Sequence, residues 1–289
     1  MYDLKCLIKR NILIFLRDKT AVFFSFLSVM ILLALYFLFI GRQFTSGSDF
    51  DGMSSNLKTY LSTSVIMGGV LVINTVSLAL GVMGNIITDM EYKILDGFLV
   101  TPVRRQKIVI SYYISSIIVT ATLTLMMWFI TVIYVGLAST YWYSFGTILK
   151  VSGLIVFYTL ISATLMIFLV TRLKSVNAFG TLSGVLGTLI GFMSGIYMPL
   201  IALGQSMAYV ASLVPFTHMT ILLKQVILAG PYQEIGVHMA EGVAPFYGTR
   251  EIGILGQNIN LWIIMGITVL IGLVLLYFAQ RKLEKQMSK

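Results

Sequence analysis

Residues 89–107, DMEYKILDGFLVTPVRRQK, separate two long apolar runs of the chain. The apolar residues of this segment fall at i, i+1, i+4 and i+5, which is one stripe of a helix: Ile94, Leu95, Phe98 and Leu99. Pro102 cannot continue that helix, because it lacks an N–H group and its ring crowds the preceding turn. The segment therefore predicts a short amphipathic helix at a membrane surface, too short to cross lipid.

The composition of the whole chain predicts a polytopic membrane protein. Hydrophobic residues make up 58% of the 289 residues and charged residues 11%, with a mean hydropathy of +0.93. The formal charge of +9 does not indicate a nucleic-acid partner, since the basic residues follow the connections between apolar runs. The lone cysteine, Cys6, cannot form an internal disulfide.

A spanning helix needs roughly 20 apolar residues, and six stretches of the chain qualify. They are residues 21–40, 61–88, 108–136, 149–170, 178–198 and 261–280. Residues 1–20 carry apolar positions at helical spacing with basic side chains on the other face, which predicts a helix lying in the membrane interface. We expect one all-α membrane domain over residues 1–289.

Orientation follows from the basic residues. Fifteen of the 20 lysines and arginines lie in the leader, in residues 89–107, at Arg172 and Lys174, and in the C-terminal tail. Because these connections alternate with the spans, they share one side of the membrane, and basic connections are typically cytoplasmic. Both termini are predicted to be cytoplasmic, in a multi-pass protein of the cell membrane.

The stretch 199–230 is almost as apolar as the spans, but Pro215 divides it and it carries His218 and Lys224. Each half is too short to cross the bilayer, and a single crossing would place the basic tail outside. We expect a re-entrant helix pair on the outer face. The glycine-containing stretch 231–257 is predicted to be an outer loop.

Two stripes of small and polar residues run along predicted spans. In the second span, amide, hydroxyl and glycine positions share a face: Asn74, Ser77, Gly81, Asn85 and Thr88. In the fifth, five glycines share a face flanked by Ser183 and Ser194: Gly180, Gly184, Gly187, Gly191 and Gly195. Such stripes allow close helix packing and interhelical hydrogen bonds. Static packing and the lining of a path between two copies both remain open.

The ionisable residues argue against two other classes of protein. All eleven acidic residues fall at span ends or in connections, whereas ion-coupled carriers place such a site near the midplane. Asp89, Glu91 and Asp96 invite comparison with a metal-dependent lipid enzyme, but nearby Lys93 suggests an ion pair with these acids. The two histidines are too isolated to indicate a metal site. The sequence contains no G-x-x-x-x-G-K-S/T phosphate loop, so it binds no ATP by that means.

Two motifs resemble those of the ABC-2 type transporter permeases. The first is the order of an acid, LDGFL at 95–99, TPVRR at 101–105 and a new span; the second is YMPL at 197–200 followed by LVPFTH at 213–218. The resemblance implies that residues 89–107 dock in a groove of a separate ATPase subunit. The residues that would carry this coupling are Glu91, Leu95, Asp96, Phe98, Leu99, Pro102, Arg104 and Arg105.

The resemblance also implies an ATP-driven exporter built from two permease copies and two ABC ATPase subunits. ATP and Mg²⁺ would then belong to the partner, with no cofactor or metal in this chain. The uncharged spans favour an amphipathic or hydrophobic cargo such as a drug, an antimicrobial peptide or a lipid. A polysaccharide or glycolipid exporter and, less favoured, a secondary carrier are the alternatives. The candidate route or seam residues are Asn74, Ser77, Asn85, Ser183, Gly187, Gly191 and Ser194.

Overall fold

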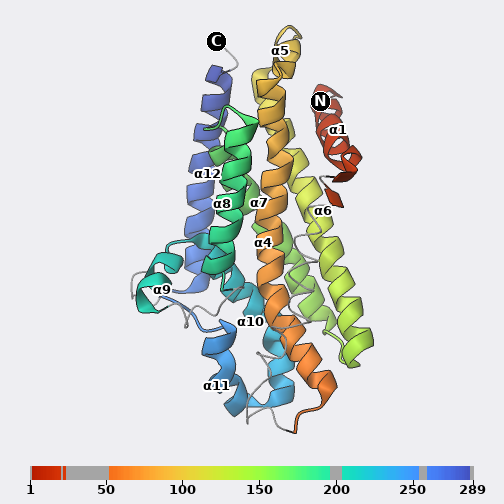
Figure 1. Cartoon of the computed structure of the whole chain (residues 1–289), viewed down its shortest axis with the longest axis vertical. Helices are drawn as coiled ribbons and strands as arrows, with labels where there is room; N and C mark the ends of the chain where they lie inside the picture. The colour runs from red at the N-terminus through yellow and green to blue at the C-terminus, as the bar shows by residue number, and fades with distance from the viewer. Residues whose placement is uncertain (1, 21, 24–51, 196–203, 254–258, 287–289) are drawn as a thin grey trace.

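The computed structural model describes residues 2–20, 22–23, 52–195, 204–253 and 259–286, and these residues form helices without any β-strand (Figure 1). The helices are α1 (Tyr2–Arg17), α4 (Ser55–Glu91), α5 (Ile94–Leu99), α6 (Arg105–Ser139), α7 (Phe145–Val170), α8 (Val176–Met193), α9 (Gln205–Ser212), α10 (Pro215–Ile235), α11 (Val237–Tyr247) and α12 (Leu261–Gln286). The prediction of an all-α membrane protein is confirmed.

Five described helices are long and apolar enough to span a membrane: α4, α6, α7, α8 and α12. They coincide with five of the six expected spans, and the expected span 21–40 lies outside the described residues. A sixth crossing would be the pair of α9 and α10, which meet at an angle of 90°. The start of the predicted re-entrant stretch, residues 199–203, also lies outside the described part.

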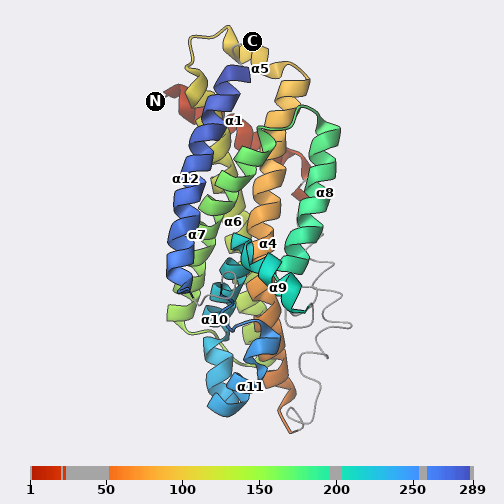
Figure 2. The ribbon, with the colours of Figure 1, turned by 90° about the vertical axis from the view of Figure 1, so that its left-hand side faces the viewer.

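Helix α4 is the centre of the bundle, with α6, α7, α8 and α10 around it (Figures 1 and 2). The most apolar stretch of α4 is largely buried, as expected for a helix that is hydrophobic on every side. Helix α8 is the opposite case, because little of its apolar stretch is buried by the rest of the described chain. The core of the protein therefore lies along α4, and α8 offers an unpacked apolar face.

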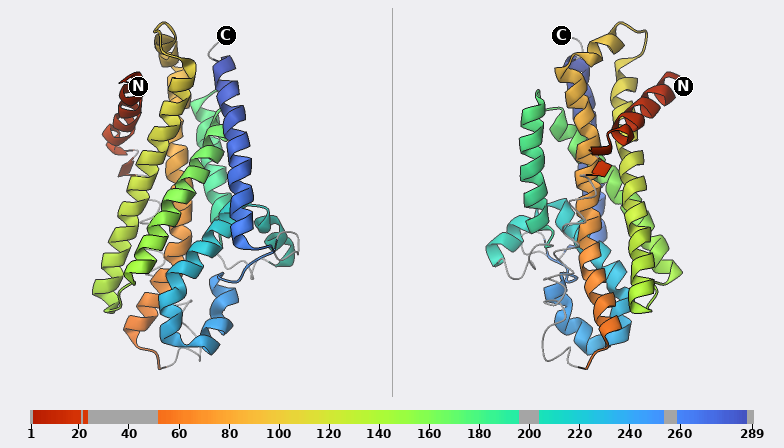
Figure 3. Two further views of the ribbon diagram at one scale, coloured as in Figure 1. Left: turned by 180° about the vertical axis from the view of Figure 1, so that it is seen from behind. Right: turned by 45° about the vertical axis from the view of Figure 1, so that its right-hand side comes forward.

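Helix α1 packs against the bundle at the end that also holds α5 and the last turns of α12 (Figures 1 and 2). We call this end the basic end, because the leader, the 89–107 segment and the tail meet there. Figure 3 shows α1 running beside α6, and Phe15 packs with apolar side chains of α4 and α6. The short amphipathic leader thus buries part of its apolar face against protein.

The expectation of an outer loop at 231–257 is wrong for much of that stretch. Helix α10 continues through Pro231 to Ile235, and α11 follows directly. Gly236 (φ 82°) separates the two helices, and Gly248 (φ 69°) ends α11 in the left-handed region that favours glycine. These glycines mark helix ends instead of a loop. Lys224 of α10 holds α11 in place by donating from Nζ to the carbonyl oxygen of Tyr247, at 3.0 Å.

Candidate coupling site

The expected short helix exists as α5, and a change of backbone direction at Lys93 positions it. Lys93 has φ 57°, in the left-handed region, two residues after the end of α4. At the other end, the Thr101 hydroxyl donates to the carbonyl oxygen of Phe98 at 2.6 Å. The chain then passes Pro102 and begins α6 at Arg105. Helix α5 is held between two long helices, so a force on it reaches both of them.

The two sides of α5 have different surroundings. Leu95 is 6% exposed and belongs to the buried core of the bundle, and Phe98 is half-buried against that core. Ile94 and Asp96 are exposed, and Val100, directly after the helix, is 86% exposed. The predicted stripe is therefore divided, with one side on the bundle and the other facing outward. The side chain of Leu99 lies outside the described part of the chain.

A partly buried ion pair connects α1 to the end of α4, close to α5. The Arg10 guanidinium donates to both carboxylate oxygens of Asp89, at 2.5 and 3.0 Å. The hydroxyl of Tyr112, from α6, donates to the same carboxylate and accepts from Arg10 at 3.2 Å. The Asp89 side chain is 5% exposed and that of Arg10 is 27% exposed. This two-pronged geometry is the strong form of an ion pair.

Phe98 joins this group from α5. The guanidinium carbon of Arg10 lies 5.1 Å from the centre of the Phe98 ring, within the range of a cation–π contact. Hydrogen bonding to Asp89 raises the pKa of Arg10 above its ordinary value, so the guanidinium stays charged. We name Arg10, Asp89, Phe98 and Tyr112 the Arg10 cluster. It brings α1, α4, α5 and α6 together at one point.

The suggested ion pair between Lys93 and Asp89 or its neighbours is wrong. In the described ranges the ion pairs are Arg10–Asp89 and the exposed pair Lys107–Asp3, whose atoms lie 2.9 Å apart. Lys93 forms the left-handed turn between α4 and α5, and its side chain is exposed. Sequence proximity favoured Lys93, but the packing of α1 brings a distant cation to the buried carboxylate.

Glu91 connects the same segment to α8. Its carboxylate accepts a hydrogen bond from the backbone N–H of Val176, at 2.6 Å, in the first turn of α8. Ser175 caps the same end by accepting from the N–H of Ala178 at 3.2 Å. A carboxylate at a helix N-terminus is favourable because free N–H groups and the helix dipole meet there. Glu91 is therefore engaged within the chain.

The remaining predicted coupling residues lie on the outside of the basic end. Pro102, Arg104 and Arg105 are exposed, and Asp96 is exposed beside them. Arg104 also precedes the first turn of α6 in extended conformation. The structure thus divides the predicted set into residues that hold α5 to the bundle and residues that face solvent.

The polar residues of α4 do not form one continuous lining. Asn74 is buried and donates to the hydroxyl of Thr124 in α6 at 3.4 Å, which is interhelical hydrogen bonding. Ser77 is exposed. The Asn85 side chain is half-buried, and its amide nitrogen has no hydrogen-bond partner among the described residues. The stripe therefore contains a packed residue, an exposed residue and a half-buried amide whose nitrogen is buried without a partner among the described residues.

Within α8, the glycine stripe is largely open. A Cβ atom added at Gly180, Gly184 or Gly187 would meet nothing within 4 Å in the described chain. Ser183 donates within its own helix to the carbonyl of Phe179 at 2.8 Å. Farther along, Gly191 and Ser194 are buried, and the Ser194 hydroxyl oxygen has no partner among the described residues. Close contact with α4 instead uses Phe179, which lies against Gly84.

Sequence reasoning missed four residues of the cluster or its surroundings as site residues, namely Arg10, Asn11, Ser111 and Tyr112. Arg10 belonged to the basic leader, and Tyr112 and Ser111 lay inside an apolar span. Asn11 of α1 donates to the Ser111 hydroxyl at 3.2 Å and strengthens the same contact between α1 and α6. One signal was present in the sequence, namely an arginine on an amphipathic leader and an aspartate at a span end, both needing a partner.

These features define a multi-pass α-helical membrane protein whose short interspan helix lies at the same end as its amphipathic leader. Residues 2–228 match the profile of the ABC-2 type transporter family, and the chain belongs to that family. It is a permease subunit of an ABC transporter, a class that works with an ABC ATPase. The comparison with curated proteins gave no match.

Proposed function

We propose that this permease exports an amphipathic or hydrophobic molecule, as a pair of identical chains driven by two ABC ATPase subunits that bind Mg²⁺ and ATP. The observation that carries the proposal is the division of α5 into two sides. Leu95 and Phe98 fasten it to the bundle, while Ile94, Asp96 and Val100 face outward. An exposed apolar patch beside a carboxylate suits a protein partner.

Motion of α5 has three routes into the membrane helices. Leu95 transmits displacement to the core around α4, and Phe98 reaches α1 through Arg10. Glu91 reaches the N-terminus of α8. When the ATPases close, we expect α5 to move with them and to tilt α4 and α8 together. The proposed orientation places the basic end in the cytoplasm, where ATP is available.

The second copy is proposed to pack on α8. This helix is apolar and mostly exposed among the described residues, and Gly180, Gly184 and Gly187 have open space before them there. A two-fold pair would place the same surface of each chain against the other, as closed dimers do. The cargo would pass between α4 and α8 of the two copies, along Ser77, Asn85, Ser183 and Gly187. None of these side chains is charged, which favours an apolar or amphipathic cargo.

The test is to purify the complex from native membranes and measure bound ATPase, ATP turnover and transport of a lipophilic dye. Val100→Asp should reduce co-purified ATPase, because it places a charge on the outward surface of the segment. Phe98→Asp should leave ATPase bound but separate ATP turnover from transport. Val237→Asp, an exposed valine on α11 at the opposite end, is the matched control. Unchanged transport in both test variants would refute the assignment, and transport of a glycan in place of the dye would replace the cargo class.

A further inference from the structure

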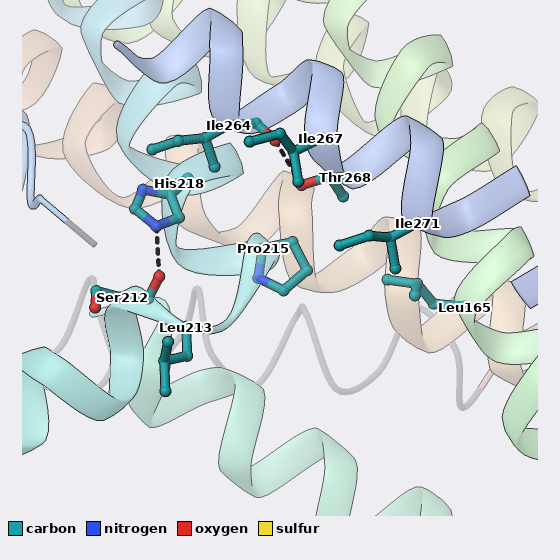
Figure 4. A pocket seen from close by; sticks show the side chains of 9 residues that line it. All are labelled: Leu165, Ser212, Leu213, Pro215, His218, Ile264, Ile267, Thr268 and Ile271. Atoms are coloured by element: carbon teal, nitrogen blue, oxygen red, sulfur yellow. Dashed lines mark hydrogen bonds between the residues drawn. The ribbon is translucent and has the colours of Figure 1, made fainter. Parts of the chain in front are cut away.

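Helices α7 and α12 carry apolar side chains on a shared side, from the middle of the bundle to the basic end. The pattern begins at Leu165 of α7 and Ile271 of α12, which line one cavity and lie side by side in Figure 4. Along α12, positions spaced by 4, 3 and 4 residues share one face of the helix: Ile271, Leu275, Phe278 and Lys282. Ile271 and Phe278 are 52% and 54% exposed. This face is therefore open to the surroundings of the bundle and ends at a cation.

Helix α7 contributes a matching face that also ends at a cation. Leu165, Phe168 and Arg172 are spaced by 3 and 4 residues, so they lie one above the other. The guanidinium carbon of Arg172 lies 4.6 Å from the centre of the half-buried Phe168 ring, which is a cation–π contact. The backbone N–H of Arg172 donates to the carbonyl oxygen of Leu169 at 3.0 Å. Side chain and backbone together hold Arg172 at the end of the apolar face.

Three cations converge where the two faces end. Arg172 and Lys174 lie in the turn between α7 and α8, beside the last turns of α12 (Figures 1 and 2). Their positive charges are close enough to repel that of Lys282. None of the three forms an ion pair with a carboxylate whose side chain the structure describes, and Glu91 at the same end accepts from the N–H of Val176 instead. Like charges gathered without a partner attract an anion.

The depth of the apolar face indicates that this anion is a lipid headgroup. From Ile271 to Lys282 the helix rises roughly 16 Å, at 1.5 Å per residue. The hydrocarbon core of a bilayer is about 30 Å thick, so one leaflet contributes about 15 Å. An acyl chain that lies along the face therefore reaches Ile271 while its phosphate stays at the cations. A free anion would use the cations alone and leave the apolar face uncovered.

We propose that this face of α7 and α12 binds one anionic phospholipid of the surrounding membrane. Its phosphate lies at Arg172, Lys174 and Lys282, and one acyl chain follows α12 past Phe278 toward Ile271. Basic sites between spanning helices bind the headgroups of anionic lipids in this way. The site lies apart from the outward side of α5 and from the proposed route along α4 and α8. The lipid is therefore a bound component of the subunit, and the proposal does not depend on export.

The test is native mass spectrometry of the full chain in a non-ionic detergent, titrated with dioleoyl-phosphatidylglycerol. Dioleoyl-phosphatidylcholine is the matched probe, because it has the same acyl chains and a phosphate but no net charge. We expect the first phosphatidylglycerol to bind at least tenfold more tightly, since each cation beside an anionic lipid contributes about fivefold. An excess of inorganic phosphate should not displace it. Equal binding of the two lipids, or displacement by phosphate, overturns the proposal.

Variants that remove charge locate the site. Arg172→Gln combined with Lys282→Gln should lower the affinity for phosphatidylglycerol about 25-fold and leave that for phosphatidylcholine unchanged, which also reports that the chain is folded. Lys5→Gln combined with Lys9→Gln is the matched control, because it removes two exposed cations of α1 from the same end of the bundle. An equal loss in the control shows a general attraction to the basic end and refutes the site.

Two further measurements distinguish the lipid from other occupants. Phosphatidylglycerol with a diazirine near the end of one acyl chain should label α12 around Ile271 and α7 around Leu165. Labelling confined to other helices overturns the placement of the chain. If Arg172→Gln with Lys282→Gln retains full phosphatidylglycerol binding but loses co-purified ATPase, these cations serve the protein partner and the proposal is refuted.

Discussion

The ion pair between Arg10 and Asp89 gives the sharpest quantitative prediction. Removing one partner of a buried ion pair typically costs 3–5 kcal/mol, because the other charge is left without compensation. The two partners differ in exposure, at 27% for the Arg10 side chain and 5% for that of Asp89. Arg10→Gln leaves the more buried charge alone, so we expect a cost of about 4 kcal/mol. Asp89→Asn leaves the more exposed charge alone and should cost about 2 kcal/mol.

The assay is amide hydrogen exchange of α1 in the reconstituted chain, with α7 as the internal reference. If exchange in α1 follows its detachment from α4 and α6, Arg10→Gln should accelerate it by roughly three orders of magnitude and Asp89→Asn by roughly thirtyfold. The double variant should cost much less than the sum of the two, because it leaves no lone charge. Exchange in α7 should not change.

The control is the exposed ion pair at the same end of the chain. Lys107 and Asp3 also join α6 to α1, at 2.9 Å, but both side chains are substantially exposed. Lys107→Gln should change the exchange of α1 little, since surface ion pairs contribute little to stability. The reasoning is refuted if Arg10→Gln and Asp89→Asn are additive within about 0.5 kcal/mol, or if Asp89→Asn is the more damaging of the two.

Three further substitutions test contacts elsewhere in the bundle. Glu91→Gln weakens the cap of α8, and exchange of amides in its first turn should accelerate about fivefold, for a loss of about 1 kcal/mol; no acceleration would mean that the carboxylate does not cap. Gly84→Leu places a side chain where Phe179 lies, 2.8 Å from the Cβ position, and should separate α8 from α4, measured as a loss of cysteine cross-linking between them. Lys224→Met removes the donor to the Tyr247 carbonyl and should increase proteolysis of α11 without altering α1 exchange; equal proteolysis would show that α11 is held by other contacts.

The sequence alone determined which described helices are long and apolar enough to span a membrane and where a short helix interrupts them. Those properties are local. In lipid, the backbone N–H and C=O groups of a long apolar run find partners within the run when it is helical, and Pro102 ends any helix that reaches it. Local signals also misled at residues 231–257, where the glycines predict a loop. Gly236 and Gly248 instead end two helices, and the neighbouring helices hold α11 in place.

The tertiary structure decided which residues of the coupling segment face the bundle and which face outward. Leu95 and Phe98 share a predicted stripe with Ile94, yet only the packing of α5 against the bundle, including Arg10 of α1, makes the first two inward and the third exposed. The pairing of Arg10 with Asp89 spans 79 positions in sequence, so no local pattern could select it over Lys93. Periodicity determines which side chains share a surface of a helix, whereas the partner of that surface depends on contacts between distant segments.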